Sequence, residues 1–165
     1  MARGMSALPH QSETGDGMTQ FIRRLELHEM DEAAIVHRRS FDATLPWLAG
    51  LHTPAEDRAF FRSVIFPSCQ VWGSFNADAM TGFIAFREDW IDQLYVLPDQ
   101  QARGAGGALL TLAQSTFPHL DLWTFQKNSR ARTFYERRGF VVQEMTDGSR
   151  NEEREPDVRY RWSRA

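Results

Sequence analysis

The stretch of sequence best suited to bind a ligand is Gln101–Gly107, which leads directly into an Ala- and Leu-rich segment predicted to be a helix. Three glycines, Gly104, Gly106 and Gly107, therefore fall around the first turn of that helix. Glycine within a helix costs ~1 kcal/mol relative to alanine, so this clustering indicates that a ligand approaches the backbone closely. Free N–H groups at a helix start bind anions, and a pyrophosphate is the expected guest.

Two common phosphate-binding motifs do not match this stretch. A Rossmann fingerprint requires a glycine three positions after Gly106, where the sequence has Leu109. A P-loop requires Gly-Lys-Ser or Gly-Lys-Thr, and the stretch contains no lysine. Glycines selected only for helix packing remain the alternative.

A second group of polar side chains falls on one face of a predicted helix, Asn128–Arg138. Asn128, Arg132 and Tyr135 are spaced by four and three residues, so all three could address one ligand. A tyrosine hydroxyl, with a pKa of about 10, is protonated at neutral pH and is a usable proton donor. The alternative for Tyr135 is a core aromatic beside Phe134.

Both segments resemble the GNAT superfamily of acyl-CoA-dependent N-acetyltransferases. The superfamily signature Gln/Arg-x-x-Gly-x-Gly/Ala is matched by Gln101, Gly104 and Gly106. Its cofactor-side strand resembles Leu94-Tyr95-Val96, followed by Pro98. Its Asn-x-x-Ala-x-x-Phe-Tyr-x-x-x-Gly-Phe helix resembles the residues Asn128, Ala131, Arg132, Phe134, Tyr135, Gly139 and Phe140.

The resemblance implies acetyl-CoA as acyl donor, no metal, and direct transfer of the acetyl group to a primary amine. The backbone of Leu94 and Val96 would pair with the pantetheine arm, and the amides of 102–107 would hold the pyrophosphate. Tyr135 would protonate the departing thiolate. The implied cofactor-binding residues are Leu94, Tyr95, Val96, Gln101, Ala102, Arg103, Gly104, Ala105, Gly106, Gly107, Asn128 and Arg132.

The base that accepts the amine's proton does not transfer from the family. Some members use a glutamate on the strand before the Asn-containing helix, where this chain has Leu122-Trp123-Thr124. Asp92 is the candidate, because alternation along the strand places it on the same face as Leu94 unless a bulge intervenes. A solvated strand-end carboxylate is the equally weighted alternative.

The acceptor is left open as a small molecule or a peptide. The segment Phe41–Thr53 occupies the place where relatives cover their acceptor site, so Trp47, His52 and Trp90 are candidates to line an amine pocket, with ordinary packing as the alternative. Two rival functions are retained. One is a non-catalytic acyl-CoA sensor or interaction module, and the other is a cysteine-based acyltransferase that uses Cys69, a thiol more simply explained as buried.

The elements that must position these residues alternate between strands and helices. The expected fold is one α/β (α+β) domain with a mixed, mostly antiparallel, twisted sheet flanked by helices and splayed at its central strands. The expected strands are 21–27, 70–75, 81–87, 90–96, 120–125, 140–144 and 158–162. The expected helices are 31–39, one that begins at Pro54 after a Thr53 cap, 104–117 and 128–138. The charged run 147–156 is expected to be a solvated loop.

Composition bounds the function further. The chain has 165 residues, a net charge of -3 and one cysteine, which argues against nucleic acid or an anionic membrane as partner and against an intrachain disulfide. No apolar window approaches the ~20 residues needed to span a bilayer. We expect residues 1–19 to be a disordered leader, with Met18 as an alternative start, before an N-acetyltransferase domain over residues 20–165. We also expect a cytoplasmic location and a possible homodimer.

Overall fold

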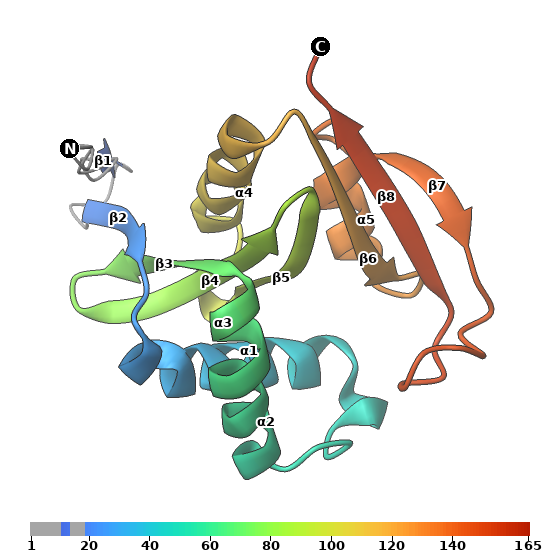
Figure 1. Ribbon diagram of the computed structural model, residues 1–165, viewed down its shortest axis with the longest axis horizontal. Helices are drawn as coiled ribbons and strands as arrows, with labels where there is room; N and C mark the ends of the chain where they lie inside the picture. Colours follow the sequence, from blue (N-terminus) through green and yellow to red (C-terminus); the bar gives the residue numbers. More distant parts are fainter. Residues whose placement is uncertain (1–10, 14–18) are drawn as a thin grey trace.

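An eight-stranded sheet runs through the part of the chain that the computed structural model describes, residues 11–13 and 19–165 (Figure 1). In spatial order its strands are β1 (Gln11–Glu13), β2 (Thr19–Arg24), β3 (Gln70–Asn76), β4 (Ala79–Arg87), β5 (Trp90–Val96), β6 (His119–Phe125), β8 (Asp157–Ser163) and β7 (Val141–Met145). Neighbouring strands are antiparallel except β5 and β6, which are parallel because a helix crosses between them. The expected mixed, mostly antiparallel sheet is confirmed.

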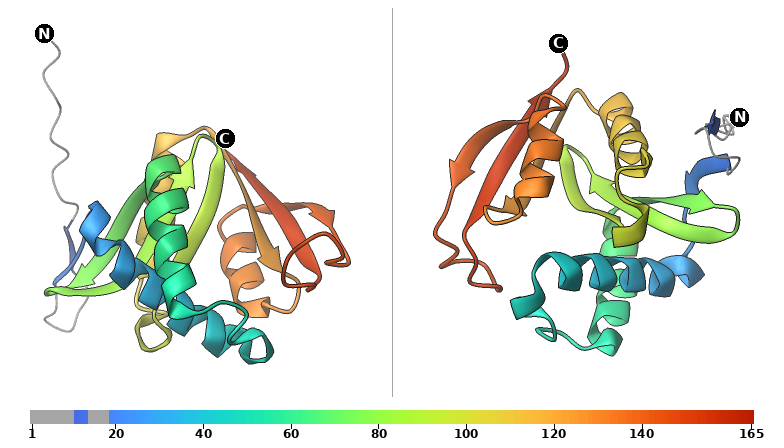
Figure 2. Two further views of the ribbon diagram at one scale, coloured as in Figure 1. Left: turned by 60° about the horizontal axis from the view of Figure 1, so that its bottom comes forward. Right: turned by 180° about the vertical axis from the view of Figure 1, so that it is seen from behind.

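Helices cover both faces of this sheet, as the two views of Figure 2 show. The helices are α1 (Met30–Thr44), α2 (Pro54–Phe60), α3 (Phe66–Ser68), α4 (Ala105–Thr116) and α5 (Ser129–Glu136). Short turns are η1 (Leu27–Glu29), η2 (Pro46–Leu48), the π-helical η3 (Phe61–Ile65) and η4 (Pro98–Gln100). Among the described residues, no helix is long and apolar enough to cross a membrane.

The alternation of side chains along β4 divides the interior into two cores. Phe83 and Ala85 pack with α1 and η3 on one face, whereas Ile84 and Phe86 pack with α4 and α5 on the other. Because both faces are covered, β4 is buried from Met80 to Phe86 and its sequence is a nearly continuous apolar run. This strand is therefore the rigid centre on which both sides of the site are built.

Local sequence signals explain where most helices begin and end. Thr53 and Glu56 form a capping box, with Pro54 in the first turn of α2, as expected. The segment Phe41–Thr53 differs from expectation, because its first four residues continue α1 to Thr44. The helix ends only at Leu45, since the residue before a proline disfavours helical backbone.

The parallel strands β5 and β6 are paired at a single position, Trp90 with Asp121. Beyond it, Ile91 pairs with Phe86 of β4 and Gln93 pairs with Ala85, so Asp92 is an extra residue in the ladder. Such a bulge bends its strand and increases the local twist. β5 accordingly diverges from β6, and the expected splay at the central strands is confirmed.

The expected leader over residues 1–19 falls mostly outside the described residues. Within it, Gln11–Glu13 form β1, which pairs with β2 from residue 19 onward. The rest of that expectation, over residues 1–10 and 14–18, stays untested.

A partly buried histidine lies between α1 and the sheet. The ring of His37 packs against Phe41, Phe61 and, edge-on at 4.7 Å between centroids, Tyr95. Its Nδ1 atom has no hydrogen-bond partner among the described residues. Burial lowers the pKa of His37 to about 4, because the charged ring would lose its hydration.

We therefore expect the free energy of unfolding to fall on acidification. Between pH values of about 6.5 and about 4 the unfolded chain binds a proton at His37 and the folded chain does not. Stability thus decreases as the pH falls through this window, by up to about 3 kcal/mol. Urea unfolding of the wild type and of His37→Phe across this range measures the effect, because the other histidines contribute to both proteins. Identical pH slopes in the two proteins would contradict it.

Candidate active site

A groove with a volume of about 570 Å³ opens where β5 and β6 separate. It brings together most residues expected to bind the cofactor. Those that line it are Leu94, Tyr95, Val96, Gln101, Ala102, Gly104, Gly106, Gly107 and Asn128. Tyr135 also lines it, whereas Arg103, Ala105 and Arg132 are not among its lining residues.

The edge of β5 supplies free backbone donors to this groove. The N–H of Leu97 donates to the carbonyl of Thr81 in β4, and successive N–H groups of a strand point to opposite edges. The N–H groups of Val96 and Leu94 therefore point away from β4, toward the gap. The carbonyl of Val96 is occupied, since it accepts hydrogen bonds of 2.9 Å from the Ser40 hydroxyl and from Nε2 of Gln101.

The start of α4 forms an open cradle of backbone amides. Gly104 caps the helix with a φ of 93°, a left-handed conformation that favours glycine, and a Cβ there would meet no atom within 4 Å. A Cβ at Gly106 would lie 3.4 Å from the ring of Phe134 and would narrow the groove. These glycines thus leave space in front of unpaired helix N–H groups, which fits a bound pyrophosphate.

Helix α5 forms the opposite wall. Asn128 is its N-cap, with Oδ1 accepting a hydrogen bond of 3.1 Å from the Ala131 N–H, so only its amide NH₂ remains for a ligand. Arg132 points elsewhere, because its Nε donates to the Tyr160 hydroxyl at 3.0 Å and its NH2 lies 3.8 Å from Glu136. Asn128, Arg132 and Tyr135 therefore do not address one ligand in this structure.

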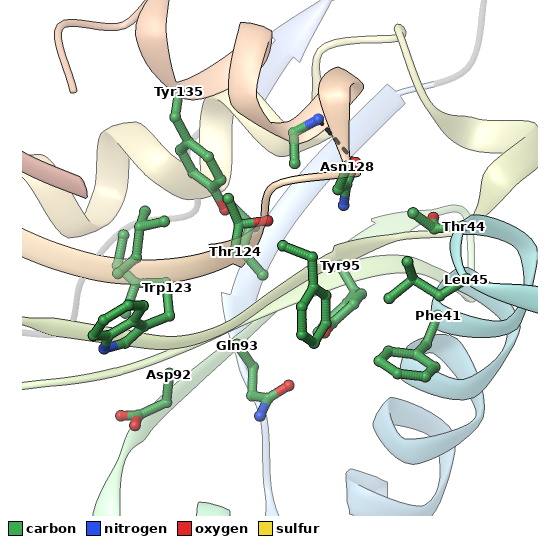
Figure 3. A pocket seen from close by; sticks show the side chains of 15 residues that line it. Phe41, Thr44, Leu45, Asp92, Gln93, Tyr95, Trp123, Thr124, Asn128 and Tyr135 are labelled. Carbon is green, nitrogen blue, oxygen red and sulfur yellow. Dashed lines mark hydrogen bonds between the residues drawn. The ribbon is translucent and has the colours of Figure 1, made fainter. Parts of the chain in front are cut away.

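A narrower pocket of about 100 Å³ meets the groove from the other side of the gap (Figure 3). We call it the acceptor pocket. The two cavities share Thr44, Leu94, Tyr95, Asn128, Ala131 and Tyr135. Asp92 is the charged side chain among the residues that line the acceptor pocket. The other lining residues are apolar or uncharged: Phe41, Leu45, Ile91, Gln93, Leu122, Trp123, Thr124 and Phe125.

Asp92 lines this pocket, and its carboxylate also contacts Arg87 and Cys69. Its carboxylate lies 3.0 Å from Nε of Arg87 and accepts a hydrogen bond of 3.4 Å from the Cys69 thiol. The bulge at Asp92 is the irregularity that breaks the simple alternation expected for this strand. Burial and the Asp92 charge raise the pKa of Cys69 to about 12, so this thiol is neutral, which disfavours it as an acyl-carrying nucleophile.

Two buried tyrosines lie where the cavities meet. Tyr135 reaches from α5 into the acceptor pocket, and burial raises its pKa well above the ordinary value for tyrosine. Burial, together with the charge of Glu153, raises the pKa of Tyr95 to about 12. Both hydroxyls therefore stay protonated at neutral pH and can donate a proton or a hydrogen bond.

The three residues expected to line an amine pocket do not come together. Trp47 donates its indole N–H to Glu155 at 2.6 Å, and Nε2 of His52 lies 3.0 Å from Glu152, so both contact the loop between β7 and β8. Trp90 lies at the opposite end of β5 from Val96 and pairs with β6.

Arg138, Lys127 and Trp123 are among the residues around the two cavities that were not predicted from the sequence. Arg138 stacks over Phe134 with its guanidinium carbon 3.8 Å from the ring centroid and lines the groove, as does Lys127. Trp123 lies in the acceptor pocket and is 42% exposed. The spacing of Phe134, in α5, and Arg138, which lies four residues later and just beyond its C-cap, is the one signal that could have found any of them.

Comparisons with known proteins agree with this geometry. A family model described as "Acetyltransferase (GNAT) domain" matches residues 67–142. The peptidyl-lysine N-acetyltransferase YjaB of Escherichia coli strain K12 is 33% identical over 73% of this chain and 82% of its own. The solution structure of apo YjaB from Escherichia coli has a TM-score of 0.73, with 27% identity over 88% of this chain and 99% of that one.

A third comparison concerns the fold. The PaiA N-acetyltransferase of Thermoplasma acidophilum, solved in complex with coenzyme A, shares the fold with a TM-score of 0.65 and 21% identity over 87% of this chain and 98% of that one. Fold and groove thus define an acyltransferase. The chain belongs to the GNAT family of N-acetyltransferases, which use acetyl-CoA. Among the described residues, no three His, Cys, Asp or Glu side chains are grouped as metal ligands would be.

We expect acetyl-CoA to stabilise the folded protein through the groove. At 100 times its Kd a ligand raises the free energy of unfolding by about 2.7 kcal/mol. Gly106→Val places a branched side chain in the cradle without requiring a left-handed backbone, so the shift in Tm produced by acetyl-CoA should be largely lost. Thr111→Val, an exposed change on the same helix, is the matched control and should keep the full shift. An undiminished shift in Gly106→Val would contradict the cradle.

Proposed function

We propose that this N-acetyltransferase acetylates the ε-amine of a lysine side chain in a peptide or protein. The observation that carries the proposal is the small volume of the acceptor pocket. This volume, about 100 Å³, is well below the about 300–1,000 Å³ of sites for drug-sized ligands. The pocket therefore fits a slender aliphatic chain that ends in an amine and does not fit a bulky antibiotic.

The chemistry of the pocket walls supports the same acceptor. Trp123 and Phe41 offer apolar surface to a four-carbon stem, and Asp92 offers a carboxylate to an ammonium group. The name of the YjaB relative, peptidyl-lysine N-acetyltransferase, points in this direction too.

The groove would be the acetyl-CoA site. The amides at the start of α4 would hold the pyrophosphate, and the free N–H group of Val96 would pair with the pantetheine arm. Arg138 and Lys127, at the rim of the groove, add positive charge that suits a phosphorylated ligand. When bound there, acetyl-CoA supplies a thioester whose acetyl carbon is the electrophile.

The residues where the two cavities meet would then carry the transfer. Asp92 would bind the ammonium group of the acceptor and take up its proton, directly or through a water, so that the free amine attacks. A backbone N–H of β5 at Leu94 would donate a hydrogen bond to the carbonyl oxygen. As the C–N bond forms and the C–S bond breaks, the hydroxyl of Tyr135 would give its proton to the departing sulfur and would regain one from the nitrogen, which loses its second proton as the amide forms.

The rival function, an acyl-CoA sensor on the same fold, makes a different prediction. A sensor would show the stabilisation by acetyl-CoA described above but would release no free thiol when lysine peptides are added. Thiol release with a lysine peptide, and its absence with a peptide whose lysine is replaced by norleucine, separates the two functions.

We expect Tyr135→Phe to lower kcat by about 100-fold, the usual contribution of a general acid. Because burial raises the pKa of Tyr135, the wild-type kcat should not decline as the pH rises toward about 10. Tyr160→Phe is the matched control, since that hydroxyl bonds to Glu136 at 2.6 Å and to Arg132, outside both cavities. Full turnover in Tyr135→Phe at every pH would show that another group protonates the thiolate.

We expect Asp92→Asn to lower kcat/KM for the lysine peptide most strongly at neutral pH, where the acceptor is almost entirely ammonium. At a pH near 10 the free amine is abundant and the defect should shrink. Initial rates of thiol release across this range measure the effect. A defect of constant size would show that Asp92 does not take the proton.

A further inference from the structure

Glu155 is a buried carboxylate in the loop between β7 and β8. The expectation of a solvated loop is wrong here, because Glu155 is only 8% exposed. One oxygen accepts the hydrogen bond of 2.6 Å from the Trp47 indole, and Nζ of Lys127 lies 3.5 Å from the other. Nζ of Lys127 also lies 5.0 Å from the centroid of the Trp47 ring. Three segments distant in sequence thus meet at one carboxylate.

The loop itself is folded around the backbone of Glu155. The side chain of Asn151 donates to the Glu155 carbonyl at 2.7 Å and accepts from its N–H at 3.2 Å. Gly148 has a φ of 78° and lies so close that a Cβ there would come within 2.3 Å of the Glu155 backbone. These contacts all involve the main chain of Glu155, so a change of its side chain leaves them in place.

This carboxylate joins two walls of the acceptor pocket. Trp47 follows Leu45, which lines the pocket from the end of α1, and Lys127 follows Phe125, which lines it from the end of β6. Figures 1 and 2 show the loop between β7 and β8 beside the turn η2 that carries Trp47. A second contact, the exposed pair of His52 and Glu152, joins the same two segments.

We propose that Glu155 is a positioning residue that fixes the width of the acceptor pocket and thereby limits the enzyme to slender amines. The inference rests on the proposed function for the identity of the acceptor. Without the carboxylate, the Trp47 N–H and the Lys127 ammonium lose their shared partner, and η2 separates from the end of β6. The pocket then widens, binds a lysine side chain less well and admits water.

Kinetics of Glu155→Ala test this role. Hydrogen bonds to a charged group are strong enough that KM for a lysine peptide should rise about tenfold or more, while kcat and KM for acetyl-CoA stay close to wild type. Trp47→Phe, which removes the N–H donor together with part of the ring, should act in the same direction. Glu155→Gln should recover part of the loss, because its amide oxygen can still accept from Trp47.

A matched control and a change of acceptor sharpen the test. Glu152→Gln alters a glutamate of the same loop in an exposed pair and should change KM by less than about twofold. Benzylamine, which carries a ring close to its amine, should be a poor acceptor for the wild type. In Glu155→Ala, its kcat/KM should rise relative to that of the lysine peptide. An unchanged ratio of the two acceptors, with unchanged KM, would overturn the proposal.

Two further readouts do not depend on the acceptor. In Glu155→Ala, hydrolysis of acetyl-CoA to acetate and free thiol in the absence of amine should increase several-fold, because water reaches the thioester. The Trp47 indole N–H, assigned in NMR spectra through Trp47→Phe, should exchange faster with solvent. If the wild type fails to acetylate lysine, the proposed function fails while these readouts still decide the role of Glu155. If Glu155→Ala hydrolysed acetyl-CoA and exchanged the Trp47 N–H at the wild-type rates, this role of Glu155 would be refuted.

Discussion

The separation of β5 from β6 is the constraint on which the rest of the site depends. A strand in the middle of a sheet ordinarily hydrogen-bonds through its N–H and C=O groups to both neighbouring strands, and an unpaired edge inside a protein costs free energy. Here the ladder stops after Trp90 and Asp121, and the bulge at Asp92 turns β5 away. The gap exposes backbone donors on one side and a carboxylate on the other, so two ligands can approach the same point from opposite sides.

Two sets of contacts hold the strands and helix around this gap in place. On the far side of it, Asp121 is 2% exposed and its carboxylate is paired with Arg159 at 2.7 Å and Arg161 at 2.6 Å, so its side chain ties β6 to β8. A buried carboxylate is stable only when it is fully paired in this way, and loss of one partner would be strongly destabilising. On the near side, the helix α4 packs on β4 and β5 through Leu109 and Leu110, which holds its glycine-rich start at the mouth of the gap.

Much of this architecture is readable from the sequence because its signals are local. The short strand-like runs that form β3, β4 and β5, the Thr53 cap before α2 and the glycines before α4 each act through neighbouring residues. The groove was predictable for the same reason, since backbone amides at a helix start need no particular partner. The end of α1 was less predictable, because the segment after Arg39 is apolar enough to pack as a helix until Pro46 forbids it.

The acceptor side was not predictable, because it is built from contacts between residues far apart in the chain. Trp47 and Glu155 are 108 positions apart, and nothing in the local sequence of either indicates the other. The charged run around Glu155 has the composition of a solvated loop, yet one of its carboxylates is buried against an indole and an ammonium group. Arg132 shows the complementary difficulty, since helical spacing placed it on one face with Asn128 but did not reveal that its guanidinium bonds to Tyr160.

The two cavities require different things of the sequence that forms them. The groove relies on backbone groups and needs mainly small residues, so many sequences can form it and a short motif suffices to recognise it. The acceptor pocket relies on the volume and charge of particular side chains, among them Trp123, Asp92 and the walls that Glu155 joins. On the proposed function, substitutions in these side chains should therefore change the amine that is accepted without disturbing the groove, because the cavities share only the few residues where they meet.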